Sequence, residues 1–143
     1  MNFNDLVSWL LRSRWHVILS SSLMLVQVTG RKTGRLVRLP VNYHTEGDEL
    51  WVISSRERVW WRNLQADPLA VLWLRGEQVS ARGELVLDEG LVAARLSKLC
   101  KDDAGLARAL SIRLDETKTP LVEDLHGVAL QRMFVKFTLQ AAL

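Results

Sequence analysis

The chain has 143 residues and a formal net charge of +3; 48% of its residues are hydrophobic and 24% are charged. This length and balance are typical of a globular protein with a sizeable core, so they exclude a disordered chain. The sequence has no apolar run close to the roughly 20 residues that span a bilayer, and its start lacks a signal-peptide pattern. Its one cysteine, Cys100, cannot form an intrachain disulfide, so we expect a cytoplasmic location.

The positive charge is concentrated near the start of the chain. Residues 1–45 carry six cations against one anion, whereas the remainder carries 13 cations and 15 anions. Four of the six cations lie within eight residues, namely Arg31, Lys32, Arg35 and Arg38. Nucleic-acid-binding proteins usually spread basic residues over a wider face. The pattern therefore favours a small anionic ligand and no nucleic acid.

Residues 1–17 predict an amphipathic N-terminal helix. Its apolar residues follow helical spacing: Phe3, Leu6, Val7, Leu10 and Leu11. Tryptophan and arginine side chains flank this apolar face, and a basic helix of this kind can lie on a membrane surface. Residues 1–15 are thus a candidate for peripheral membrane contact, and packing of the helix on the domain is the alternative.

Six segments have the composition or the alternation of strands: residues 18–29, 36–44, 50–54, 69–74, 78–87 and 133–139. In the second, Pro40 removes a ladder hydrogen bond, which predicts an edge or a bulge. In the fifth, Gly83 predicts a bulge. Short turns make neighbouring strands antiparallel, and closure of the sheet hides its apolar edges. The sequence therefore predicts an α+β fold with a six-stranded antiparallel barrel and flanking helices.

Helical spacing predicts the helices at residues 59–66, 89–101, 103–112 and 121–130. Residues 89–130 then form a helical insertion before the last strand. The sequence shows no repeat, low-complexity segment or linker, so we expect a single domain over residues 1–143.

The loop at residues 29–35, Thr-Gly-Arg-Lys-Thr-Gly-Arg, joins the first two predicted strands. Its side chains offer charge-assisted donors, and its glycines allow backbone N–H groups to turn inward around an anion. Four cations without an acid between them repel one another, which favours a bound counter-charge. A basic surface turn without a ligand is the alternative. The candidate binding residues here are Arg31, Lys32, Thr33, Gly34, Arg35 and Arg38.

Two further groups follow along the chain. Ser55 and Arg56 come directly after the third predicted strand, where a strand end can present hydrogen-bonding groups to a ligand. Trp60 and Trp61 begin a short helix that continues with Asn63. One tryptophan can stack on an aromatic ring while the other enters the core, and two core anchors are the alternative.

Several other kinds of site are not indicated. The three histidines, His16, His44 and His126, have no Cys, Asp or Glu at ligand spacing, so we expect no metal site. The nucleophile elbow, the P-loop and the dinucleotide fingerprint are absent. Cys100 is interpreted as a small core residue of a helix.

Together these motifs resemble the deazaflavin-dependent nitroreductase and quinone reductase family. The matching residues, in order, are Thr29-Gly30-Arg31-Lys32-Thr33-Gly34, Pro40, Gly47-Asp48, Trp60-Trp61-Arg62-Asn63-Leu64 and Ala66-Asp67-Pro68. The resemblance covers residues 10–87 well and the rest loosely. It implies a split β-barrel related to the FMN-binding, pyridoxamine-phosphate-oxidase-like fold, and it implies the 8-hydroxy-5-deazaflavin coenzyme F-420.

The resemblance also implies roles for single residues. Arg31, Lys32 and Thr33 would hold the phosphate or the polyglutamate tail of the coenzyme, and Ser55 would lie near the deazaflavin ring. The residues that match the wall of the pocket are Trp60, Trp61 and Asn63. The implied reaction is hydride transfer from the reduced coenzyme to a quinone, a nitro compound or an activated enone. Because the cofactor does this chemistry, no catalytic acid or base is named.

The sequence departs from the family pattern at two places. Some members have a tyrosine near the substrate two residues after the proline, where this chain has Asn42, which is kept among the candidate cofactor-binding residues. Many have a Gly-Gly pair and a longer loop after the serine, where this chain has Arg56-Glu57-Arg58-Val59. The chain is more similar to a shorter subgroup with Trp-Trp-Arg-Asn-Leu.

Other functions fit part of the pattern. The same barrel can use FMN, because the turn accepts a ribityl phosphate equally well. A non-catalytic carrier of a flavin-type ligand is another alternative, and so is a membrane-surface or nucleic-acid-binding protein that uses the basic N-terminal third. Barrels of this kind often pair through their sheet faces, so the resemblance implies a homodimer, with a small-molecule oxidant as the substrate.

Overall fold

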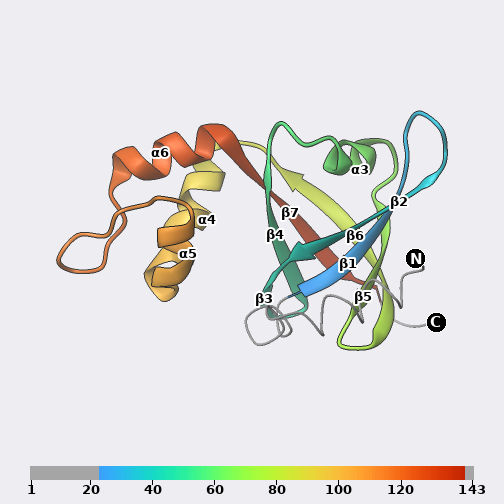
Figure 1. Ribbon diagram of the computed structural model, residues 1–143, viewed down its shortest axis with the longest axis horizontal. Coiled ribbons are helices and arrows are strands. Elements are labelled where there is room, and N and C mark those ends of the chain that lie inside the picture. Colours follow the sequence, from blue (N-terminus) through green and yellow to red (C-terminus); the bar gives the residue numbers. More distant parts are fainter. Residues whose placement is uncertain (1–22, 141–143) are drawn as a thin grey trace. The chain divides into compact units, whose positions relative to one another are not determined.

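The computed structural model describes residues 23–140, and Figure 1 gives the element labels. The strands are β1 (Leu23–Thr29), β2 (Leu36–Asn42), β3 (His44–Glu46), β4 (Glu49–Ser55), β5 (Leu69–Leu74), β6 (Glu77–Val86) and β7 (Arg132–Leu139). The helices are the 3-10 helix η1 (Trp60–Arg62), then α3 (Asn63–Ala66), α4 (Glu89–Asp102), α5 (Ala104–Ala109) and α6 (Val122–Gln131). The predicted N-terminal helix and the candidate membrane contact at residues 1–15 lie outside the described residues, as do residues 18–22.

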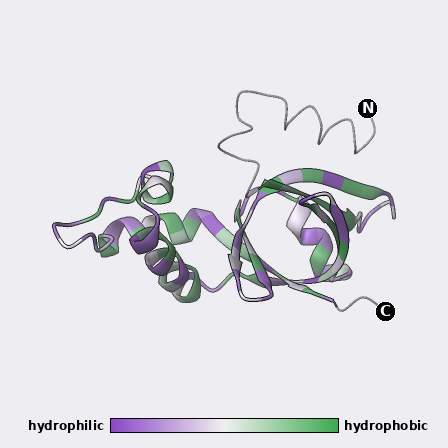
Figure 2. Cartoon of the chain, turned by 90° about the horizontal axis from the view of Figure 1, so that it is seen from below, coloured by the Kyte–Doolittle hydropathy of each residue, from purple (hydrophilic) through white to green (hydrophobic). Residues whose placement is uncertain are grey.

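The strands form one curled antiparallel sheet, a half-barrel (Figure 2). Their order in the sheet is β2-β1-β5-β6-β7-β4-β3. This confirms the predicted fold class, but the described residues contain seven strands and not six. The predicted strand at residues 36–44 ends at Asn42, where β2 stops pairing with β1. The chain then passes through the buried Tyr43 to β3, which pairs with β4 at the opposite edge of the sheet. One continuous segment, residues 36–46, thus supplies both edge strands of the described sheet.

Two residues that interrupt the strand patterns have physical explanations. Pro40 lies on β2, which is an edge strand, so the missing N–H costs no ladder hydrogen bond on the open side. Gly83, where the sequence predicts a bulge, is also a site of close packing. A Cβ at Gly83 would lie 3.0 Å from a methyl carbon of Leu64 and 3.1 Å from the Phe137 ring. Only glycine lets α3 and β7 approach β6 this closely.

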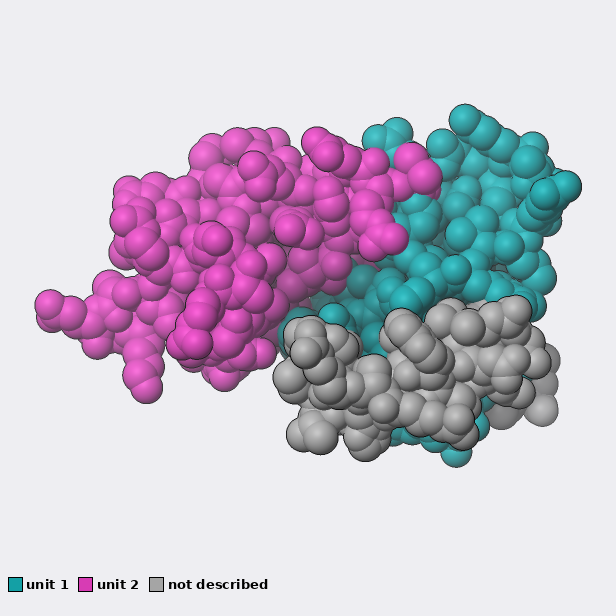
Figure 3. All heavy atoms as spheres, viewed as in Figure 1, with its two compact units in different colours: residues 1–52, 60–84, 136–143 teal, residues 53–59, 85–135 magenta. Residues whose placement is uncertain are grey.

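Within the described residues the chain divides into two compact units (Figure 3). Unit 1 comprises residues 23–52, 60–84 and 136–140, and unit 2 comprises residues 53–59 and 85–135. The boundaries fall inside β4, β6 and β7, and the single domain stays a prediction. In unit 1, fully buried side chains from β1, β5, β6 and β7 form the core: Val26, Leu72, Ala81 and Phe137.

Unit 2 contains α4, α5 and α6, and α4 packs against both of the other helices (Figure 1). One stripe of α4 is fully buried and consists of Val92, Leu96 and Cys100. Burial, reinforced by the nearby Asp103 carboxylate, raises the pKa of the Cys100 thiol, so this group is a poor nucleophile. The structure thus confirms Cys100 as a core residue.

Helix α5 ends at Ala109, three residues before the predicted end of this helix. The N–H of Ile112 donates to the Ala107 carbonyl and the N–H of Ser111 donates to the Arg108 carbonyl, with Ser111 at φ 60°. These two bonds are those of a Schellman motif, which closes a helix. Among residues 23–140, no helix has both the length and the apolar character needed to cross a membrane.

Candidate functional site

The loop between β1 and β2 is a tight turn in unit 1 that the two glycines make possible. The N–H of Gly30 donates to the Arg35 carbonyl at 2.7 Å, and the N–H of Gly34 donates to the Gly30 carbonyl at 2.9 Å. A Cβ at Gly30 would lie 2.8 Å from the Arg35 oxygen, and Gly34 has φ +72°, in the left-handed region. Other side chains are therefore strained at both positions.

A buried carboxamide from α3 holds this turn. The N–H of Arg31 donates to Oδ1 of Asn63 at 3.0 Å, across 32 positions of sequence. Asn63 is only 7% exposed, at the first residue of α3. The Thr-Gly-Arg-Lys-Thr-Gly loop and the Trp-Trp-Arg-Asn helix, which the sequence analysis singled out separately, thus meet in the fold.

Most backbone N–H groups of the turn are occupied within the protein. The N–H groups of Gly30, Arg31 and Gly34 donate as described, and that of Arg35 donates to Oγ1 of Thr33 at 3.2 Å. Among residues 23–140, only the Lys32 and Thr33 amides of this loop make no hydrogen bond. The two glycine amides close the turn, so only the Lys32 and Thr33 amides of the described loop are left for the predicted anion nest, which stays a prediction. Side chains are therefore the main donors to a ligand.

The cations at the tip of the turn are exposed and close in sequence. Within the described part of the chain, the side chains of Arg31, Lys32 and Arg35 form no ion pair or hydrogen bond. Arg38 differs, because its Nε donates to Oε1 of Gln27 on β1 at 2.8 Å, which holds it along the strand. Three exposed cationic side chains thus lie on one turn without an acidic residue, an arrangement that suits a multiply charged anion.

The structure places the other predicted residues of unit 1 away from this role. Trp60 and Trp61 are both buried at 5% exposure, so both are core anchors; the guanidinium carbon of Arg62 lies 5.1 Å from the centroid of the Trp61 ring. Asn42 is exposed at the far end of β2. It is six positions along β2 from Leu36 at the turn, which corresponds to about 20 Å along a strand. The structure does not bring Asn42 to the turn.

The second predicted group lies in unit 2, where Ser55 is the last residue of β4. Its carbonyl accepts the Arg58 N–H at 3.2 Å and the Ser54 hydroxyl at 3.2 Å, and its Oγ accepts the Glu57 N–H at 3.3 Å. These bonds fold the chain sharply after the strand. Ser55 is thereby held half-exposed at the start of a tight turn.

Arg56 is engaged by main-chain carbonyl groups. Its Nη2 donates to the Leu87 oxygen at 2.7 Å and to the Ala129 oxygen at 2.9 Å, and its Nε donates to the Ala129 oxygen at 3.2 Å. Its own N–H donates to the Gln131 carbonyl at 2.9 Å. The guanidinium therefore links three segments of unit 2.

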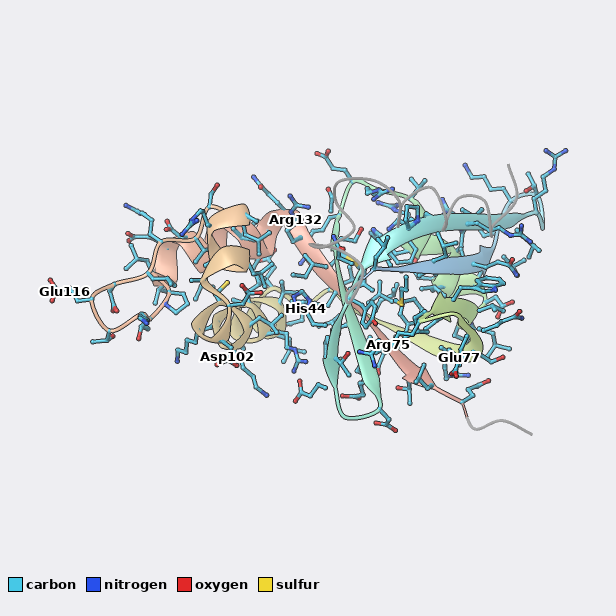
Figure 4. All side chains as sticks on the ribbon, turned by 60° about the horizontal axis from the view of Figure 1, so that its bottom comes forward. His44, Arg75, Glu77, Asp102, Glu116 and Arg132 are labelled. Carbon is cyan, nitrogen blue, oxygen red and sulfur yellow. The ribbon has the colours of Figure 1, made fainter. Side chains whose placement is uncertain are left out.

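A cavity of about 370 Å³ lies beside this group, lined by Ser55, Arg56, Glu57, Leu130, Gln131 and Arg132. Figure 4 shows Arg132 where α6 meets β7. The sequence analysis missed the last three residues, because no motif marks a helix-to-strand junction as part of a site. The signal in the sequence is the polar pair Gln131-Arg132, which stands where the helix ends and the apolar strand begins.

Residues 14–105 match the family model described as F420H(2)-dependent quinone reductase. Comparison with the curated proteins gave no significant match. Among solved structures, a conserved hypothetical protein from Mycobacterium tuberculosis has 14% identity and a TM-score of 0.58, over 99% of this chain and 82% of that chain.

Two further solved structures have similar folds. A candidate 5-nitroimidazole antibiotic resistance protein from Bacteroides thetaiotaomicron has 13% identity and a TM-score of 0.57, over 91% of this chain and 81% of that chain. A protein of the pyridoxinephosphate oxidase family from Clostridium acetobutylicum is related to general stress protein 26. It has 12% identity and a TM-score of 0.53, over 97% of this chain and 86% of that chain. At these identities the likeness supports the fold alone.

Proposed function

The chain belongs to the F420H(2)-dependent quinone reductase family, and we propose that its substrate is a quinone, reduced by hydride transfer from coenzyme F-420. As a member of this family it is an oxidoreductase whose cofactor is the deazaflavin. Nitro compounds and activated enones are the other acceptors to be tested. The observation that carries the proposal is the family match, which includes both the cationic turn and the helix that holds it.

The donor set at the turn fits the anionic part of the coenzyme. F-420 carries a phosphate and a tail of several glutamates, whereas FMN carries a phosphate alone. Three exposed cations without an acid suit the larger number of negative charges. We therefore propose that Arg31, Lys32 and Arg35, with the Thr33 hydroxyl, hold the phosphate and the start of the tail.

The remaining roles are those of binding and orientation. The reduced deazaflavin, when bound, supplies the hydride, and we propose solvent as the source of the proton that completes the hydroquinone. The resemblance supports a place for the Ser55 hydroxyl beside the ring. Asn63 keeps the turn in its binding shape through the Arg31 amide. Orientation of the reacting groups is the main contribution that such residues make to hydride transfer.

Loss of one cation at the turn tests the anion assignment. We expect Lys32→Ala to weaken binding of F-420 by ~1.5–3 kcal/mol, the scale of a hydrogen bond to a charged group. This corresponds to a rise in Kd of roughly 10- to 150-fold. The matched control is Lys101→Ala, which removes an exposed lysine at the end of α4 in unit 2. Equal Kd values for the two variants would sink the assignment.

The acceptor is tested by mixing the enzyme and reduced F-420 with a quinone, a nitroaromatic compound or an activated enone. Reoxidation restores the fluorescence of the deazaflavin. We expect the quinone to be reduced with the largest kcat/KM. Faster turnover of the nitro compound or the enone would reassign the substrate. We also propose that the protein is a homodimer, because the barrels that it resembles often form pairs. Light scattering on the protein as it elutes from a size-exclusion column measures its molar mass and tests this proposal.

A further inference from the structure

We propose that Arg56 is a positioning residue: it caps α6 and fixes the strand end that carries Ser55, and it does not bind the coenzyme itself. This inference rests on the proposed function, because it concerns the residue proposed to lie beside the deazaflavin ring. It also reinterprets Arg56, which the sequence pattern indicated as a ligand contact.

The first observation is that α6 depends on Arg56 for its C-terminal end. The last four carbonyls of a helix lack intrahelical partners. In α6, two of these, from Ala129 and Gln131, accept hydrogen bonds from the Arg56 guanidinium and the Arg56 N–H. The last turn of α6 contains no basic residue of its own. A cation at this end also interacts favourably with the helix dipole.

The second observation is the length of sequence that Arg56 connects. Its bonds join positions 31 and 73 residues further along the chain, at Leu87 and Ala129. Leu87 directly follows β6, so the ends of β4, β6 and α6 are all tied to one side chain. A planar guanidinium holds its donors in fixed directions on two nitrogens, whereas the donors of a lysine ammonium rotate about one nitrogen and fix no such geometry.

The third observation is the place of Ser55 in this arrangement. Ser55 precedes Arg56, and both line the cavity of about 370 Å³ together with Gln131 and Arg132. The Arg56 N–H bond to Gln131 therefore sets the distance between two walls of one cavity. Arg56→Met keeps this main-chain bond but removes the guanidinium bonds to Leu87 and Ala129, so we expect the strand end to move and the Ser55 hydroxyl to lose its direction.

The test is a double-mutant cycle on Ser55→Ala and Arg56→Met. Two ligands are titrated, F-420 and its deazaflavin core without phosphate and tail, and tryptophan fluorescence gives each Kd. We expect Arg56→Met to weaken both ligands by the same factor, on the order of tenfold. In the Ser55→Ala background the further loss should vanish, because Arg56 acts through Ser55. The matched control is Arg58→Met, an exposed arginine of the same turn, which should leave both Kd values unchanged.

Three outcomes overturn the inference. A loss confined to F-420 would mean that Arg56 contacts the phosphate or the tail. Additive losses in the double variant would mean that Arg56 contacts the ring directly, through Nη1, which makes no hydrogen bond within the described chain. Unchanged affinity for both ligands would mean that Arg56 has no part in the site.

Folding and binding are kept apart by two further measurements. If circular dichroism shows that Arg56→Met does not fold, Arg56→Lys replaces it in the same cycle; we expect a smaller loss, again equal for both ligands, because lysine keeps the charge and one of the bonds. If the wild-type protein binds neither ligand, the proposed function fails and this inference falls with it. Wild-type binding together with any of the three outcomes above overturns the inference alone.

Discussion

The buried carboxamide of Asn63 shows how one side chain joins two distant sequence motifs. The resemblance to the reductase family implied that Asn63 is part of a pocket wall. Its hydrogen bond to the Arg31 amide could not be predicted, because nothing in the pattern pairs residues 32 positions apart. Asn63 makes a hydrogen bond within the protein, and this bond keeps the cations of the turn in one place.

Replacing this carboxamide should destabilise the protein. We expect Asn63→Leu to lower the free energy of unfolding by about 1–2 kcal/mol, because the Arg31 N–H loses its acceptor. Urea unfolding measures the change. The control is Gln65→Leu, the same kind of change at an exposed position of α3, which should have little effect. If both variants lose equal stability, the bond to Arg31 is not what holds the turn.

At the scale of elements, the glycines show why one substitution can have opposite effects in two places. Gly30 lies where a Cβ would meet the Arg35 oxygen at 2.8 Å, whereas Gly127 lies inside α6 with nothing within 4 Å of its Cβ position. We expect Gly30→Ala to lower Tm and Gly127→Ala to raise stability by roughly 0.5–1 kcal/mol, the helix preference for alanine. Differential scanning calorimetry compares them, and a shift of the same sign in both variants would refute this explanation.

The segment before α6 is fastened to the helix by an ion pair that predicts a pH dependence. The Asp124 carboxylate accepts hydrogen bonds from the Arg113 N–H, Nε and Nη2. These bonds lower the pKa of Asp124 to about 2 from 3.8. A lowered pKa means that the folded state prefers the ionised carboxylate. Its contribution to stability is therefore complete above the unfolded pKa and disappears as the pH falls through the folded pKa.

We accordingly expect Tm of the wild type to fall more steeply than Tm of Asp124→Asn between pH 4 and pH 2, the window set by those two pKa values. Thermal unfolding followed by circular dichroism measures both slopes. Glu116→Gln is the control, because Glu116 lies at the tip of the same loop and has no side-chain partner within the described residues (Figure 4). Parallel slopes for wild type and Asp124→Asn would contradict the assignment.

At the scale of the whole molecule, apolar runs and hydrophobic periodicity predicted the order of strands and helices, because strands such as β1 bury both faces and helices such as α4 bury one. It did not predict the division of residues 36–46 into β2 and β3. The reason is that no glycine or proline marks a break at Tyr43, and the change of partner strand depends on the sheet order. The order of motifs along the chain indicated the candidate residues, but it did not predict the role of each residue. Trp60, Trp61 and Arg56 carry the residue types of a ligand site, whereas their contacts are with the protein itself.

The central claim is that the cationic turn and its supporting helix belong to a deazaflavin site. Titration of the purified protein with F-420 and, separately, with FMN tests it most directly, with quenching of tryptophan fluorescence as the signal. The account predicts saturable binding of F-420 and much weaker binding of FMN, because the tail supplies charges that FMN lacks. Tighter binding of FMN, or no binding of F-420, would contradict it.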